Sequence, residues 1–290
     1  MNKFKNIDFY FKAVISFIII FLIQFIQISP SFGQSFDNNE DDISYHLFEG
    51  QFISNCFKDA GSIVTSPLRW EGNDWLITGV VIGTTVGLYA LDTQTEKLAK
   101  NINGSSFTTA ISNVATPFGD ITYVIPTLGG VYLLGELIDD RKLRKTALLS
   151  LESLAITGTF VETLKLSFHR HRPNTGDPYN TFDGPSFSSS NLSFPSGHAA
   201  AAFSVLSVVA AEYSDVPIVP PVAYSIAALV GFSRFNDIQH WASDVFFGSA
   251  LGFLVAKTIV HSHLGSDDEA LAIYPIIDNE ISGVLVKVRF

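Results

Sequence analysis

Cysteine is almost missing from this sequence of 290 residues, because Cys56 is the only one that it holds. An internal disulfide is therefore excluded. The three residues before this cysteine, Ile53-Ser54-Asn55, do not resemble the stretch that precedes a lipid-modified cysteine. We expect no lipid anchor at Cys56.

Charged residues are also scarce, at 16% of the chain against about a quarter in average proteins. Basic residues are the rarer kind, with 18 Lys and Arg against 28 Asp and Glu. This balance disfavours nucleic acid as a partner, because nucleic-acid binding depends on Lys and Arg that neutralise phosphates. Any phosphate site in this chain must therefore be local. Apolar residues make up 47% of the sequence, so the chain can bury a large core and can contact lipid.

The first 33 residues have the layout of a secretory signal. Three lysines stand near the start, and an apolar run follows at residues 13–28. Ser31 and Gly33 then offer small side chains at the positions that signal peptidases prefer. We expect a signal peptide at residues 1–33, with cleavage before Gln34; an uncleaved membrane anchor is the alternative.

The rest of the chain divides into three parts. Residues 34–74 begin with a polar, acidic lead-in and include one short amphipathic helix that should end near Pro67. Residues 75–262 hold six apolar stretches of helix-forming composition, at roughly 75–91, 121–138, 146–164, 198–212, 218–232 and 244–260. These stretches predict an all-α fold, a helical bundle with a six-helix core.

The C-terminal tail, residues 263–290, carries a different pattern. Its last residues alternate between apolar and polar, and residues 279–283 hold turn-forming side chains. This predicts a short β-hairpin whose first strand covers residues 271–277. Three histidines outside the motifs described below are expected to be ordinary surface residues: His46, His261 and His263.

Whether the six apolar stretches cross a membrane depends on length and charge. Four of them have 17 to 19 residues, at the low end for a span, and the other two have about 15. Six spans would also place loop 139–145, DDRKLRK, outside the cytoplasm, against the positive-inside tendency. The sequence therefore favours a soluble or peripheral bundle, with an integral membrane protein as the alternative.

Three short stretches carry candidate chemistry, and the first is basic. Residues 165–173, KLSFHRHRP, gather cationic side chains that include Lys165 and Arg172. Alone, this is typical of a cationic cap at a helix C-terminus. A metal site made by His169 and His171 is disfavoured, because the flanking arginines would repel a divalent cation.

The second stretch, residues 195–198, places a histidine where a turn becomes a helix. Free backbone N–H groups and the helix dipole make such a position suitable for an anion. Gly197 lets the anion approach the backbone, Ser196 offers a hydroxyl, and His198 follows directly. Taken alone, His198 could equally be an ordinary polar residue near a helix start.

The third stretch, SRFNDIQHWASD, spans residues 233–244. His240 and Asp244 are four residues apart, which on a helix puts them on one face. A carboxylate bonded to one imidazole nitrogen fixes the tautomer and leaves the other nitrogen free to act as a nucleophile. A surface contact on a helix is the simpler reading of the pair alone.

Together, the three stretches resemble the motifs of the type 2 phosphatidic acid phosphatase / vanadium haloperoxidase superfamily. Every position of the family pattern is filled, in the family's order: Lys165-x6-Arg172-Pro173, Pro195-Ser196-Gly197-His198 and Ser233-Arg234-x5-His240-x3-Asp244. The resemblance covers residues 165–244 directly, and the six-helix plan around them extends it to residues 75–262.

The resemblance implies a role for each motif residue. His240 would attack phosphorus to form a phosphohistidine, Asp244 would orient it, and His198 would protonate the leaving oxygen and later deprotonate water. The family's reaction needs no metal. The remaining motif residues would bind the phosphate: Lys165, Arg172, Ser196, Gly197 and Arg234.

The function that the resemblance implies is hydrolysis of a phosphate monoester or pyrophosphate. The expected substrate is a lipid of the phosphatidate, diacylglycerol pyrophosphate, polyprenyl pyrophosphate or lipid A type. A soluble periplasmic acid phosphatase or phosphotransferase is the alternative. Further alternatives are a haloperoxidase that uses vanadate as cofactor and a non-catalytic envelope protein. No cofactor is expected for the phosphatase, and orthovanadate should inhibit it. We expect an exported protein of the periplasm or cell envelope, with the envelope membrane as its partner.

Overall fold

The computed structural model describes residue 45 and residues 50–264, 271–277 and 282–288. The predicted signal peptide and most of the predicted hairpin turn lie outside these residues. The helices in chain order are α2 (Gly50–Thr65), η1 (Ser66–Arg69), α3 (Gly72–Ala90), α4 (Asp92–Ile102), α5 (Ser106–Ala115), η2 (Thr116–Phe118), α6 (Ile121–Leu137), α7 (Arg141–Phe168), η3 (Pro173–Thr175), α8 (Gly197–Glu212), α9 (Val219–Asn236) and α10 (Ala242–Leu264).

The predicted all-α bundle is confirmed. The six apolar stretches correspond to α3, α6, α7, α8, α9 and α10. The amphipathic helix of the lead-in is α2, which ends at Thr65, one residue before the 3₁₀ turn that contains Pro67. Two short helices, α4 and α5, follow α3 and were not predicted. The C-terminal hairpin is also present, as antiparallel strands β1 (Leu271–Ile277) and β2 (Ser282–Val288).

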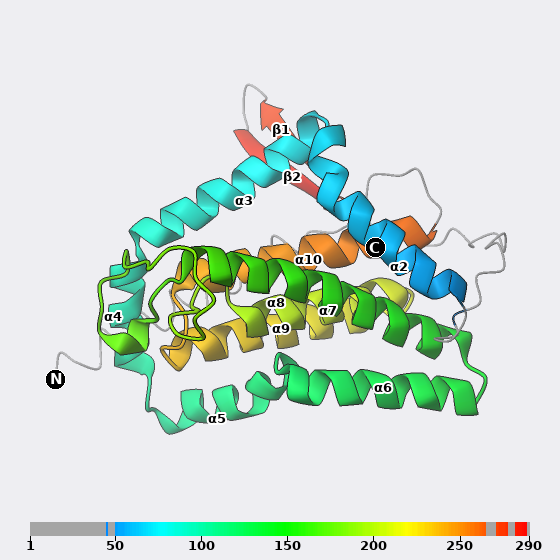
Figure 1. The fold of residues 1–290 in the computed structure, drawn as a ribbon, viewed down its shortest axis with the longest axis horizontal. Coiled ribbons are helices and arrows are strands. Elements are labelled where there is room, and N and C mark those ends of the chain that lie inside the picture. Colours follow the sequence, from blue (N-terminus) through cyan, green and yellow to red (C-terminus); the bar gives the residue numbers. More distant parts are fainter. Residues whose placement is uncertain (1–44, 46–49, 265–270, 278–281, 289–290) are drawn as a thin grey trace.

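Helix α8 forms the centre of the bundle and packs against α7, α9 and α10 (Figure 1). Its first full turn is a run of alanines, Ala199–Ala202, and all four are buried. Small residues are needed there because α10 approaches very closely. A Cβ atom on Gly252 of α10 would lie 2.2 Å from the backbone oxygen of Ala200, and one on Gly248 would lie 2.5 Å from that of Ser196. These glycines therefore fix the start of α8 against α10.

The outer helices expose apolar side chains instead of burying them. On α6, Leu133 is 60% and Leu137 is 84% exposed. Other large apolar side chains that are exposed on α3, α5 and α6 are Trp75, Val80, Ile82, Val86, Phe107, Val114, Ile121 and Ile125. Apolar surface of this extent is typical of contact with lipid or another protein.

Among the residues that the structure describes, two helices are long and apolar enough to cross a membrane, α7 and α10. A third span is available if α3 and α4 act as one, although they meet at an angle of 67°. Together with the exposed apolar surface, this fits an integral membrane protein better than the self-packed soluble bundle that the sequence favoured.

Candidate functional site

The three motifs meet at one end of the bundle. This is the end where α7 and α9 finish and where α8 and α10 begin. In Figure 1 it lies on the side of α4, opposite α2. The loop between α7 and α8, residues 169–196, covers this end and carries two of the motifs.

Lys165, near the end of α7, lies beside the PSGH turn at the start of α8. Ser196 is the N-cap of α8, and Gly197 is its first residue. A Cβ atom on Gly197 would lie 3.2 Å from the Nζ atom of Lys165, so only glycine lets the ammonium come this close without a shift. The Lys165 Nζ atom also binds Glu162 Oε1 at 2.8 Å, one turn back on α7. The hydroxyl of Ser196 is buried and has no hydrogen-bond partner among the described residues.

His198 stands one residue further along α8, as predicted, within range of several charges. Those of Arg234, His240, Asp120 and Lys165 all act on its imidazole ring. Its backbone is fixed by η2, because a Cβ atom on Gly119 would lie 2.5 Å from the His198 carbonyl oxygen.

The two arginines of the motifs lie close enough for their charges to interact. Arg234, near the end of α9, donates hydrogen bonds to Thr116 and, at 2.9 Å, to Asp237 Oδ2. Arg172 donates from Nη1 to Gln239 Oε1 at 3.0 Å, and its charge also acts on the imidazole of His240. The structure thus brings the two arginines, Lys165 and both motif histidines to one place.

His240 corrects one prediction. It lies in the turn before α10, which begins at Ala242, and so does not share a helix with Asp244. Its Nδ1 atom is 3.9 Å from Asp244 Oδ2, too far for a hydrogen bond, but only 2.7 Å from the carbonyl oxygen of Ser193. Since a carbonyl can only accept, Nδ1–H donates to Ser193. The hydrogen bond to a backbone oxygen, and not one to the carboxylate, therefore fixes the tautomer in which Nε2 is the free nitrogen.

Burial governs the protonation of His240. The residue is 5% exposed, and desolvation lowers the pKa of its imidazole below the usual value. Asp244 and the Ser193 carbonyl act in the opposite direction without cancelling that effect. The ring is therefore neutral at physiological pH, as a nucleophile must be.

Asp244 acts on His240 through Ser193. Its Oδ2 atom accepts a hydrogen bond from the Ser193 hydroxyl at 2.5 Å and another from the Trp241 backbone N–H at 3.1 Å. The Asp244 carbonyl also accepts from the Ser196 backbone N–H at 3.0 Å. The carboxylate thus fixes the residue whose carbonyl orients His240, and its backbone fixes the PSGH turn.

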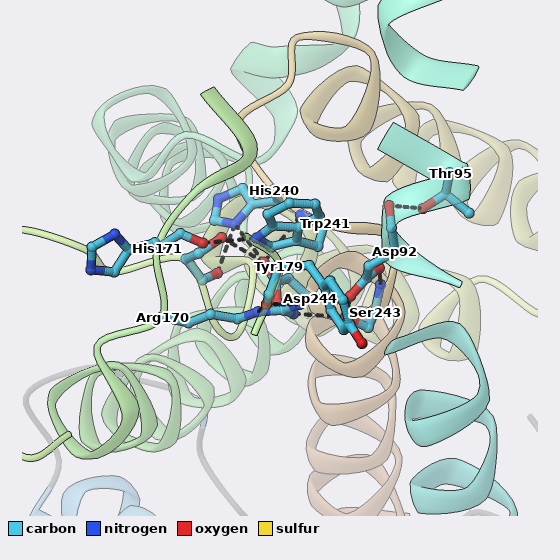
Figure 2. Close-up of polar contacts among 10 residues, drawn as sticks. Asp92, Thr95, Arg170, His171, Tyr179, His240, Trp241, Ser243 and Asp244 are labelled. Atoms are coloured by element: carbon cyan, nitrogen blue, oxygen red, sulfur yellow. Dashed lines mark hydrogen bonds and ion pairs between the residues drawn. The ribbon is translucent and has the colours of Figure 1, made fainter. Parts of the chain in front are cut away.

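Arg170 is one of the cationic side chains of the stretch KLSFHRHRP, but the sequence indicated no role for it in the site (Figure 2). Its side chain is 1% exposed. It binds Asp244 Oδ1 at 2.5 Å, Asp92 Oδ2 at 2.7 Å and Ser243 Oγ at 2.8 Å. Three aromatic rings lie within 6 Å of the guanidinium carbon, those of Tyr89, Phe182 and Trp241. One buried cation therefore joins α4 and α10 to the loop that follows α7.

The two histidines beside Arg170 contact groups of the loop itself. His169 is buried, and its ring nitrogens contact the carbonyl oxygens of Leu166 and Ser188. His171 lies between the carboxylates of Asp177 and Asp183, at 2.7 and 3.0 Å. These carboxylates raise the pKa of His171 and close the loop on itself.

The ends of α7 and α9, the start of α8 and the loops beside them thus bring one lysine, two arginines and two histidines to one point of an all-α bundle. Residues 146–267 match the family model "PAP2 superfamily" and contain all three motifs. The family that this model describes is the one that the three motifs resemble.

Two relatives place the chain more closely. It is 31% identical over 173 residues to a protein of Porphyromonas gingivalis named "Lipid A 1-phosphatase". The match covers 59% of this chain but only 36% of that relative, so the chain spans about a third of its length. The fold resembles a Bacillus subtilis crystal structure described as a transmembrane PAP2 type phosphatidylglycerolphosphate phosphatase. The TM-score is 0.50 at 22% identity, over 63% of this chain and 94% of the other.

Proposed function

We propose that this chain is a membrane-embedded lipid phosphatase that transfers the phosphoryl group to His240 and then to water. The observation that carries the proposal is the convergence of two imidazoles and three cations at the start of α8. Arg172 and Arg234 can each grip two phosphate oxygens, while Lys165 acts as a point charge. The backbone N–H groups at the start of α8 and the unpaired hydroxyl of Ser196 add donors for the same anion.

The reaction proceeds in two displacements. The lone pair on His240 Nε2 attacks phosphorus as the bond to the leaving oxygen breaks, and His198 gives that oxygen a proton. His198 then takes a proton from water, whose oxygen attacks phosphorus and releases His240 and inorganic phosphate. Charge on the equatorial oxygens is greatest in the transition states, where fixed cations lower the barrier most. No metal is needed at the reacting phosphorus.

The surface of the molecule favours a lipid as the substrate. Helices α3, α5 and α6 expose large apolar side chains, and α7 and α10 are long enough to span a bilayer. Phe187, in the loop beside the site, is 96% exposed and can reach an apolar substrate or the membrane surface. Both named relatives act on phosphorylated lipids according to their names. We propose a phosphomonoester or pyrophosphate lipid of this kind, with the cell-envelope membrane as the location.

The decisive experiment measures phosphate release by the purified chain in detergent. The substrates would be a lipid A 1-phosphate, phosphatidylglycerol phosphate, a polyprenyl pyrophosphate and a soluble chromogenic phosphoester. We expect at least one lipid to be hydrolysed faster than the soluble ester, and orthovanadate, which mimics pentacoordinate phosphorus, to inhibit. Preference for the soluble ester would favour the acid-phosphatase alternative. Bromide oxidation with vanadate and peroxide would favour the haloperoxidase, and no turnover of any substrate a non-catalytic protein.

A further inference from the structure

A second cluster of reactive side chains lies at the opposite end of the bundle, where α2 crosses α7 and α10 (Figure 1). It consists of Asp59 on α2, Glu152 on α7 and His263 on α10. His263 was expected at the surface, but its side chain is 2% exposed, so that prediction was wrong. Glu152 precedes Lys165 by 13 residues on α7, which places the cluster about 20 Å from the phosphate site at 1.5 Å per residue.

The spacing of the three side chains suits a small cation. The Nε2 atom of His263 is 3.0 Å from Asp59 Oδ2 and 3.6 Å from Glu152 Oε2. One ligand atom from each residue lies within 4.8 Å of the others. Tetrahedral zinc with bonds of about 2.0–2.2 Å separates its ligand atoms by roughly 3.3–3.6 Å. The two separations from His263 lie around this range, and the two carboxylates lie within 4.8 Å of each other, so movements of these side chains would let the three groups receive a zinc ion.

Glu152 shows that a group is needed here. Its side chain is 1% exposed, and neither carboxylate oxygen has a hydrogen-bond partner among the residues that the structure describes. A buried carboxylate without donors is strongly unfavourable.

The charge balance points to a divalent ion. Two carboxylates and a neutral imidazole carry two negative charges, which one divalent cation cancels. A protonated His263, which contacts both carboxylates, would cancel only one of the two charges, so one net negative charge would stay at the cluster. A mixed oxygen and nitrogen donor set suits zinc, because imidazole is a ligand that zinc accepts readily, whereas magnesium and calcium prefer oxygen ligands alone.

We propose that Asp59, Glu152 and His263 bind one structural Zn²⁺ ion that ties α2 to α7 and α10. The ion would replace the missing donors of Glu152 and hold the N-terminal amphipathic helix on the bundle. The ion would stabilise the fold and take no part in the reaction, because the cluster is remote from the motif residues.

The test counts zinc in the full chain. Protein purified in detergent is treated with a chelator, supplied with Zn²⁺, freed of excess metal and analysed by mass spectrometry for zinc. We expect about one ion per chain in the wild type. His263→Ala, Glu152→Gln and Asp59→Asn should each bind it more than about 100-fold more weakly, because changes in the outer shell of a metal site alone lower affinity by 10–100-fold. Two matched controls, His261→Ala on the same helix and Asp215→Asn at the surface, should keep the ion.

Thermal unfolding gives a second measurement. Zinc should raise the Tm of the wild type and both controls, and leave the three cluster variants unchanged. If Glu152→Gln does not fold, Asp59→Asn decides alone, since Asp59 is partly exposed. Equal zinc content in the wild type and His263→Ala would overturn the proposal. The proposal would also be overturned if the wild type bound no zinc and Glu152→Gln, free of metal, were more stable than the wild type. Glu152 would then hold a proton in place of a metal. Chelation should leave phosphate release intact, which separates this proposal from the proposed catalysis.

Discussion

The two ends of α7 and α10 bury acidic side chains in opposite ways. At the phosphate end, Asp92 and Asp244 share Arg170, and each also accepts hydrogen bonds from serine and backbone donors. At the α2 end, Glu152 is equally buried and has no donor among the described residues. The chain therefore neutralises charge with its own side chains at the end where the motif residues meet. At the other end it leaves a charge that a bound cation can neutralise.

The largest effect should follow from removing the nucleophile. His240→Ala should lower phosphate release by roughly 10⁴-fold or more, as for other nucleophiles that act within a catalytic unit. The fold and zinc binding at the α2 end should not change, because His240 lies in a turn and donates only to a backbone carbonyl. Steady-state kinetics and zinc content measured on the same preparation check both statements. A variant with near wild-type turnover would contradict the assignment of His240.

Arg170→Ala should have the next largest effect and should act on stability as well as on turnover. It leaves Asp92 and Asp244 buried without their shared cation, and breaking a buried pair in this way lowers the free energy of unfolding by about 3–5 kcal/mol. Denaturant unfolding measures the loss. Arg170→Lys should not restore it, since a single ammonium cannot reproduce the two-sided contact of the guanidinium. Arg69→Ala, at an exposed position, is the matched control, and an equal loss there would contradict the role of Arg170.

The pH dependence tests the indirect contact between Asp244 and His240. Burial lowers the pKa of His240, so this residue contributes stability that is present above the ordinary value of about 6.5 and lost as pH falls below it. Activity should likewise fall on the acid side, at the lowered pKa, as the nucleophile gains a proton. Asp244 opposes the lowering, so Asp244→Asn should move the acid limb of kcat to still lower pH and reduce kcat less than His240→Ala does. An acid limb at the same pH in both proteins would show that Asp244 does not act on His240.

The sequence predicted the phosphate end better than the α2 end, for physical reasons. Motif residues such as Lys165 and His198 have fixed spacing along the chain, and the apolar stretches gave the helices that present them. Helix α4 was not predicted, because its sequence is polar. Asp92 on this helix was therefore missed as well, although it binds Arg170, which is 78 residues further along the chain. The orientation of His240 depends on a backbone oxygen, which leaves no mark in a sequence. His263 was misplaced because only the packing of α2 buries it.

The smallest effect we predict concerns the exposed loop beside the phosphate site and neither of the two buried ends. Phe187 is 96% exposed, and among the described residues its ring makes no aromatic contact of the kind that joins Phe194 to Phe168 and Phe247. Phe187→Ala should therefore leave the Tm unchanged. It should reduce kcat/KM several-fold for a lipid in vesicles, since burial of an aromatic side chain contributes roughly 1.5–3 kcal/mol at most. A soluble phosphoester should be hydrolysed at the wild-type rate. Equal losses on both substrates would mean that Phe187 shapes the phosphate site itself and does not contact lipid.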